Sequence, residues 1–74
     1  MNTRAQLGQV AAVMMRRHLN ELMDRGVTIA DPATTVVEPG ARVGKDTVIY
    51  PFSYVSRSAV VRQGSRVGPL VHVK

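Results

Sequence analysis

Aliphatic residues recur at every sixth position through the second half of the chain. The positions that share this spacing are Val37, Val43, Ile49, Val55, Val61, Val67 and Val73. A six-residue period matches neither the 3.6-residue turn of an α-helix nor the continued two-residue alternation of a long strand. It is typical of a parallel β-helix with a triangular cross-section, in which each side is one short strand. Three such sides make one coil of about eighteen residues.

Small residues stand two positions before the aliphatic ones. They are Thr35, Ala41, Thr47, Ser53, Ala59 and Ser65, followed by the somewhat larger Val71. We expect both positions to point inward, because a narrow bore cannot accept a second set of large side chains. Residues about eighteen apart should then stack at the spacing of neighbouring strands, roughly 4.8 Å. The predicted structural core is the set of seven aliphatic positions, stacked as Val37/Val55/Val73, Val43/Val61 and Ile49/Val67 ladders.

The first 26 residues predict an amphipathic α-helix. Thr3 and Gln6 have the spacing of a capping box, and Gly26 is a typical C-terminal stop. One expected stripe contains Leu7, Val10, Ala11, Met14 and His18, with Met15, Leu19 and Leu22 beside it. Residues 27–29 read as a short strand and residues 31–32 as a turn. The predicted fold is mainly β, with a helix over 1–26 and about two coils of β-helix over 27–74, as one structural unit.

Length and composition limit the possible classes of protein. A chain of 74 residues makes one small domain with a limited core. The sequence has no Cys, which excludes disulfides and thiolate metal sites. No apolar run approaches the ~20 residues of a membrane span, and the N-terminus lacks the layout of a signal peptide. We therefore expect a cytoplasmic protein that does not interact with membranes.

The net charge of +5 raises the question of nucleic-acid binding. The basic residues are dispersed along the chain, and few aromatic residues are available for base stacking. The charge is more typical of a solvated surface, or of one that attracts a phosphorylated ligand or an acidic partner. We expect no nucleic-acid partner.

Few residues suggest chemistry. The Met14–Met15 pair could form an adaptable binding surface, although packing of the helix is the more common role of such residues. His18 has no neighbouring Asp, Glu or His at ligand spacing, so we predict no metal site. Tyr50, Phe52 and Tyr54 cluster on one coil and could line a ligand site, but such a patch more often meets another chain or the packed helix. We predict no catalytic residue and no cofactor.

Four segments carry a resemblance to a known family. They are Asn2–Leu7 with Met15–Arg17, and Gly26–Thr35 followed by Val43–Pro51. The first three resemble the junction between the two domains of the bacterial bifunctional enzyme that uridylylates N-acetylglucosamine 1-phosphate and acetylates glucosamine 1-phosphate. Val43–Pro51 resembles the opening coil of that enzyme's left-handed β-helix. The resemblance implies the inter-domain helix and first coils of a left-handed β-helix, a homotrimer and a place in UDP-N-acetylglucosamine biosynthesis. The hexads alone indicate only the broader hexapeptide-repeat superfamily.

The same resemblance implies that most active-site residues of the family have no counterpart here. The family's nucleotide-binding loop lies before the junction helix, and its catalytic His lies in later coils. The segment Gly68–Lys74 is similar to a family segment that ends in a sugar-phosphate-binding Arg, so Lys74 is the one candidate substrate-binding residue. Lys keeps the charge but loses the bidentate geometry of Arg. His72 does not match the catalytic His and is expected to be a turn residue.

Three functions remain open at this point. The first is a non-catalytic assembly module that forms a homotrimer or a stack of copies, because two coils leave exposed strand edges. The second is a small acyltransferase or sugar-phosphate-binding protein with a site between subunits, which alone would require acetyl coenzyme A. The third is a basic nucleic-acid binder, whose affinity would fall steeply with salt. We favour the first.

Overall fold

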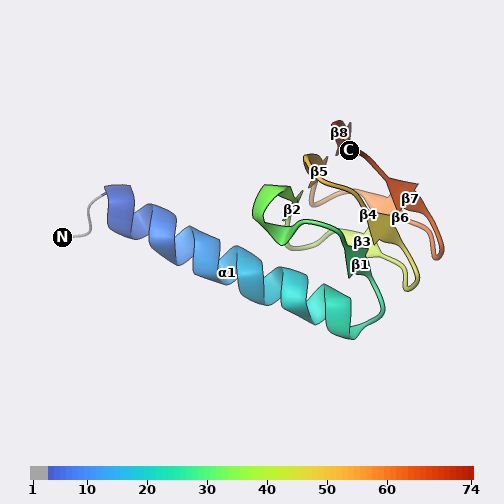
Figure 1. Cartoon of the computed structure of the whole chain (residues 1–74), viewed down its shortest axis with the longest axis horizontal. Helices are drawn as coiled ribbons and strands as arrows, with labels where there is room; N and C mark the ends of the chain where they lie inside the picture. The colour runs from blue at the N-terminus through green and yellow to red at the C-terminus, as the bar shows by residue number, and fades with distance from the viewer. Residues whose placement is uncertain (1–3) are drawn as a thin grey trace.

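The computed structural model describes residues 4–74 and contains one long helix followed by a short stack of coils (Figure 1). Helix α1 spans Arg4–Asp24. The strands are β1 (Thr28–Ile29), β2 (Val36–Val37), β3 (Arg42–Val43), β4 (Val48–Ile49), β5 (Ser53–Val55), β6 (Val60–Val61), β7 (Arg66–Val67) and β8 (Val71–Val73), and a 3₁₀ turn η1 (Pro32–Thr34) separates β1 from β2. The predicted Thr3 cap lies outside the described residues.

The strands form three parallel sheets, one for each side of the triangular coil. Their orders are β1–β4–β7, β2–β5–β8 and β3–β6. Val37 pairs with Val55 and Val55 with Val73, while Val43 pairs with Val61. Each of these steps is the predicted eighteen residues. The fold class is therefore confirmed as a short left-handed parallel β-helix behind an N-terminal helix, an exception to the usual right-handed crossover of parallel strands.

The first coil is longer than the repeat predicts. Ile29 pairs with Ile49, a separation of twenty residues, whereas Ile49 pairs with Val67 at eighteen. The extra length is taken up at the corner that contains η1. There the Asp31 carboxylate accepts a hydrogen bond from the Ala33 N–H at 3.2 Å, so this side chain caps the 3₁₀ turn. Ile29 thus joins the Ile49/Val67 ladder as its first member.

The bore of the coil holds an aliphatic core with small polar side chains at its corners. Val37, Ile49 and Val55 are fully buried, and Val43 and Val73 are partly buried against the same cluster. The buried hydroxyls bond to backbone oxygens: Thr47 donates to the Arg62 carbonyl at 3.1 Å and Ser53 to the Tyr50 carbonyl at 2.7 Å. A buried polar group must find such a partner to avoid a large desolvation cost.

Helix α1 ends in a Schellman motif. The Val27 N–H donates to the Leu22 carbonyl at 3.1 Å, and the Gly26 N–H donates to the Met23 carbonyl at 3.0 Å. Gly26 has φ of +96°, a conformation that costs glycine little. The side chains of Val27 and Leu22 are both buried in the core, which supplies the hydrophobic contact that usually accompanies this motif. The predicted stop at Gly26 is confirmed.

Only the C-terminal half of α1 packs against the coils. Leu19 and Leu22 are buried, and Met15 and Met23 are partly buried against the core. Most of the expected stripe does not contact the coils of its own chain: of its five members, Leu7, Val10, Ala11 and Met14 are exposed, and only His18 is half-buried. Figure 1 shows the reason, because α1 passes beneath the first coil and its N-terminal half continues beyond the edge of that coil. We name this projecting half, residues 4–14, the overhang.

Candidate functional site

The segment that resembles a sugar-phosphate site lies on the last coil. Strand β8 pairs with β5, so that His72 stands beside Tyr54 and Val73 beside Val55. Val73 turns toward the core and is partly buried, whereas His72 and Lys74 are exposed. His72 was expected in a turn and lies instead within a strand, because its eighteen-residue partner Tyr54 is itself in the middle of β5.

Tyr54 is the centre of a small polar group on the outer face of this sheet. Its ring contacts the His72 ring edge-on, with 4.7 Å between centroids and 71° between planes. Partial burial raises the pKa of the Tyr54 hydroxyl, and the Glu38 carboxylate raises it further by repelling the phenolate and by a side-chain hydrogen bond. The Arg57 charge acts in the opposite direction. The Glu38 carboxylate also accepts the Arg57 backbone N–H at 3.1 Å, which holds it near Tyr54.

This arrangement predicts a late titration of Tyr54. In a Tyr50→Phe chain Tyr54 is the only tyrosine, and its tyrosinate absorbance should rise with a midpoint above the ordinary value of about 10. Because the pKa is higher in the folded chain than in the unfolded one, the stability contributed by the protonated hydroxyl is complete below about pH 10. That contribution is lost as pH rises through the folded-state pKa. Adding Glu38→Gln should lower the midpoint, and a midpoint at or below 10 without that change would contradict the assigned contact.

The three aromatic residues of the second coil do not converge on one site. Tyr50 is half-buried after β4, Phe52 stands at the corner and Tyr54 lies on the outer face of β5. Phe52 has φ of +60°, and its N–H donates to the Thr34 hydroxyl of the coil below at 3.3 Å. Leu70, eighteen residues later, has φ of +59° at the same corner. The six-residue period places both residues at this corner, where Leu70 is exposed as well.

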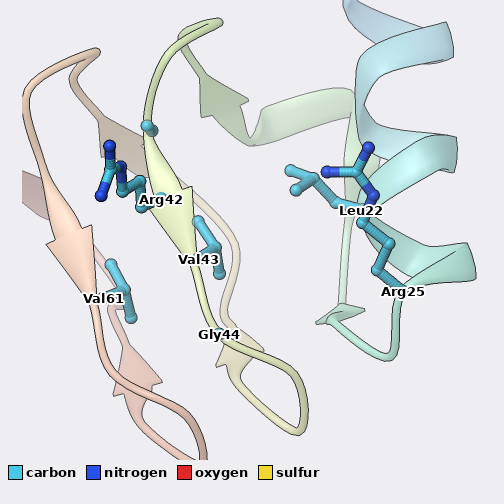
Figure 2. Close-up of a pocket in the computed structure, with 7 residues that line it drawn as sticks. Leu22, Arg25, Arg42, Val43, Gly44 and Val61 are labelled. Atoms are coloured by element: carbon cyan, nitrogen blue, oxygen red, sulfur yellow. The ribbon is translucent and has the colours of Figure 1, made fainter.

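A hollow of about 410 Å³ opens where α1 leaves the third side of the first coil uncovered. It is lined by Leu22, Arg25, Ala41, Arg42, Val43, Gly44 and Val61 (Figure 2). Strand β3 has a partner on one side only, because its sheet contains two strands. The two charged residues are both Arg, which would favour an anion, but Figure 2 shows the Arg42 guanidinium on the side of β3 away from Arg25. The hollow therefore lacks a converging pair of cations.

The two histidines lie on different elements, His18 in α1 and His72 in β8. His18 Nε2 is buried without a hydrogen-bond partner among the described residues. Within residues 4–74 no three side chains of His, Cys, Asp or Glu are grouped to hold a metal ion. Over the same residues, no helix has both the length and the apolar character needed to cross a membrane.

Comparisons with known proteins agree with the resemblance seen in the sequence. The chain is 39% identical to Bifunctional protein GlmU from Fervidobacterium nodosum and 36% identical to that from Thermotoga maritima, over 72 residues in each case. It is 54% identical over 52 residues to Bifunctional protein GlmU from Pelotomaculum thermopropionicum, covering 70% of this chain and 11% of the relative. The first two alignments cover 97% of this chain but only 16% of the relatives, so the chain spans about a sixth of their length. No protein-family model matches the chain.

Proposed function

Because this chain belongs to the family of the bifunctional protein GlmU over the segment that they share, we propose that it serves as a non-catalytic assembly module, most simply a homotrimer. The observation that carries the proposal is the overhang of α1. Leu7, Val10 and Met14 are each more than half exposed there, although they are large and apolar. Soluble chains rarely leave such a group uncovered, and partner chains are the usual cover.

Helix energetics support the same proposal. Most of the stability of a helix in a protein comes from packing of its apolar face, and no large apolar side chain within residues 4–14 is buried. Association would bury this segment and stabilise its helical form. In the proposed module, the N-terminal helix and the β-helix over 27–74 act as one structural unit. We infer that the module acts in the cytoplasm, alongside UDP-N-acetylglucosamine biosynthesis, and the family resemblance supports this.

A second candidate is a sugar-phosphate-binding protein or acyltransferase with a site between subunits. The observation that favours it is the contact between the Tyr54 and His72 rings, with exposed Lys74 two residues after His72. In this candidate, a neighbouring subunit completes the pocket beside these residues. Amide chemical shifts recorded with glucosamine 1-phosphate and with acetyl coenzyme A test it. Shifts confined to β5 and β8 would favour this candidate, and unchanged spectra at millimolar ligand would remove it.

The assembly proposal is tested by mass in solution. Light scattering across a dilution series from about 100 µM to below 1 µM should show a concentration-dependent oligomer, because association stabilises the folded chain by mass action. Helical circular dichroism should fall together with the mass on dilution. A monomer at every concentration, with undiminished helix signal, would refute the proposal.

A further inference from the structure

Strand β3 has a free edge on the side that faces α1. On its other edge the Arg42 N–H donates to the Ala59 carbonyl at 3.0 Å, and the Gly44 N–H donates to the Val61 carbonyl at 2.9 Å. Val43 lies between these residues, and backbone groups of successive strand residues point to opposite edges. Its N–H and C=O therefore point to the free edge, where neither has a hydrogen-bond partner within the described part of the chain. An unpaired edge of this kind is a template for a further strand.

Later coils of the chain cannot cover this edge, because they stack on β3 from the opposite side. Helix α1 passes beneath the first coil but packs mainly against β1 and β2. Between α1 and β3 lies the hollow of about 410 Å³, with Leu22 and Val43 in its wall (Figure 2). Val43 is only partly buried, although it belongs to an aliphatic ladder of the core. The free edge thus lies beside apolar surface that the chain itself leaves uncovered.

The charged side chains that line the hollow are both cationic. They are Arg25 and Arg42, and within residues 4–74 neither forms an ion pair. The acids nearest to them in the sequence are Glu21, Asp24 and Asp46, and none of these lines the hollow. The surface beside the free edge therefore favours an anionic partner.

The positions of the two guanidinium groups favour a long partner over a small one. Figure 2 shows Arg42 on the side of β3 away from Arg25, so a small anion cannot contact both at once. A segment in extended conformation can, because its side chains on one face follow one another at about 6.6 Å. The side chains of its other face would point into the hollow, toward Val43 and Leu22.

We infer that the free edge of β3 binds an extended acidic segment of a partner protein. The segment adds to the sheet as a strand parallel to β3, as in every other strand pair of the fold. Its main chain bonds to the Val43 N–H and C=O, the mode by which peptides extend exposed sheet edges. An apolar side chain covers Val43, and the acidic side chains on either side of it contact Arg25 and Arg42. This partner is not a second copy, and the surface is separate from the overhang.

The probe for this inference is a fluorescein-labelled hexapeptide of alternating Glu and Val, titrated with the full chain and followed by fluorescence anisotropy. In a parallel pair with β3, the backbone groups of the Glu residues face Val43 and those of the Val residues face away. N-methylation of the Glu amides should therefore weaken binding at least about tenfold, whereas N-methylation of the Val amides should not. A peptide with three Glu followed by three Val should also bind at least about tenfold more weakly, because its side chains do not alternate. Equal binding of all four peptides, or no binding at millimolar chain, would overturn the inference.

Two variants locate the site. Arg25→Gln with Arg42→Gln should raise the Kd of the alternating peptide at least about tenfold, with an unchanged circular dichroism spectrum because both side chains are exposed. Arg66→Gln is the control, since it removes an exposed strand arginine that does not line the hollow, and it should leave the Kd unchanged. A double variant that binds as tightly as the original chain would show that the peptide binds elsewhere.

Hydrogen exchange at Val43 gives a readout that does not depend on a variant. The Val43 amide should exchange at least about tenfold more slowly with saturating alternating peptide, because it gains a hydrogen bond. The Arg42 and Gly44 amides should change less, since they are already bonded to the coil above. Unchanged exchange at Val43 would overturn the inference. If Val43 becomes protected on raising the chain concentration without peptide, a second copy occupies the edge, and the inference fails while the assembly proposal stands.

Discussion

Replacing Ile49 with Ala should leave most of the chain unfolded at room temperature. Ile49 is fully buried and lies in the middle of its sheet, between the ladder partners Ile29 and Val67. Truncating a buried Ile to Ala typically costs about 2–5 kcal/mol. A chain of this size buries only about 60% of its surface and has little stability in reserve. Urea denaturation followed by circular dichroism, at one fixed protein concentration, measures the loss.

Two matched substitutions define what the Ile49→Ala result means. Ile49→Val removes one methyl group from the same site and should cost about 0.5–1.5 kcal/mol. Val60→Ala removes two methyl groups from a strand side chain that is 70% exposed, and it should change stability by about 0.5 kcal/mol or less. If Ile49→Ala unfolds at the same urea concentration as Val60→Ala, the interior of the coil is not the source of stability.

Gly44→Ala is the second substitution with a large expected effect. A Cβ at this position would collide with the backbone N of Gln63 and would lie 2.6 Å from its Cα. Both atoms belong to the backbone of the next coil, so relief requires β3 and β6 to separate. The Gly44 N–H donates to the Val61 carbonyl at 2.9 Å, and this bond would be strained as well. We expect a loss of about 3 kcal/mol, the upper end of typical overpacking costs.

Gly64 supplies the control for Gly44. A Cβ on Gly64 would meet no atom within 4 Å, but its φ of +76° disfavours a side chain. Gly64→Ala should therefore cost only the conformational term, about 1–2 kcal/mol. Denaturation midpoints that rank Gly64→Ala as the more damaging of the two would show that the coils are not in close contact at Gly44.

The sequence predicted the coils well because each inward position satisfies the same local requirement. The bore takes one aliphatic side chain at each of the positions 37, 55 and 73. The period alone therefore predicts that Val37, Val55 and Val73 form one ladder, and it predicts the register of their strands. The stacking of His72 on Tyr54 follows from the same eighteen-residue step. By contrast, the pairing of Ile29 with Ile49 was hidden, because the two extra residues of the first coil break the period before it begins.

The helix and the candidate site were less accessible to sequence reasoning. The amphipathic pattern of the sequence does not distinguish Leu7 from Met15 as a buried residue. Met15 is covered and Leu7 is not, because the coil that α1 packs on is narrower than the helix is long. The contact between Glu38 and the Arg57 backbone depends on how the turn after β2 meets the coil above it. Local preferences do not encode such distances. The candidate Lys74 is exposed at the end of the described chain, and its role as a ligand contact stays a prediction.

The twenty-residue first coil has a consequence for how a chain with this fold can change in length. A six-residue insertion within a side would keep every aliphatic residue inward yet move all later residues onto the next face of the triangle. Such a change would separate Leu70 from Phe52 while leaving the core composition intact. The corner at η1 shows the alternative, since Asp31 and its turn absorb two residues without rotating any face. Length changes are therefore expected as whole coils of eighteen residues or as small bulges at this corner. Both kinds of change keep each later residue on its original face of the triangle.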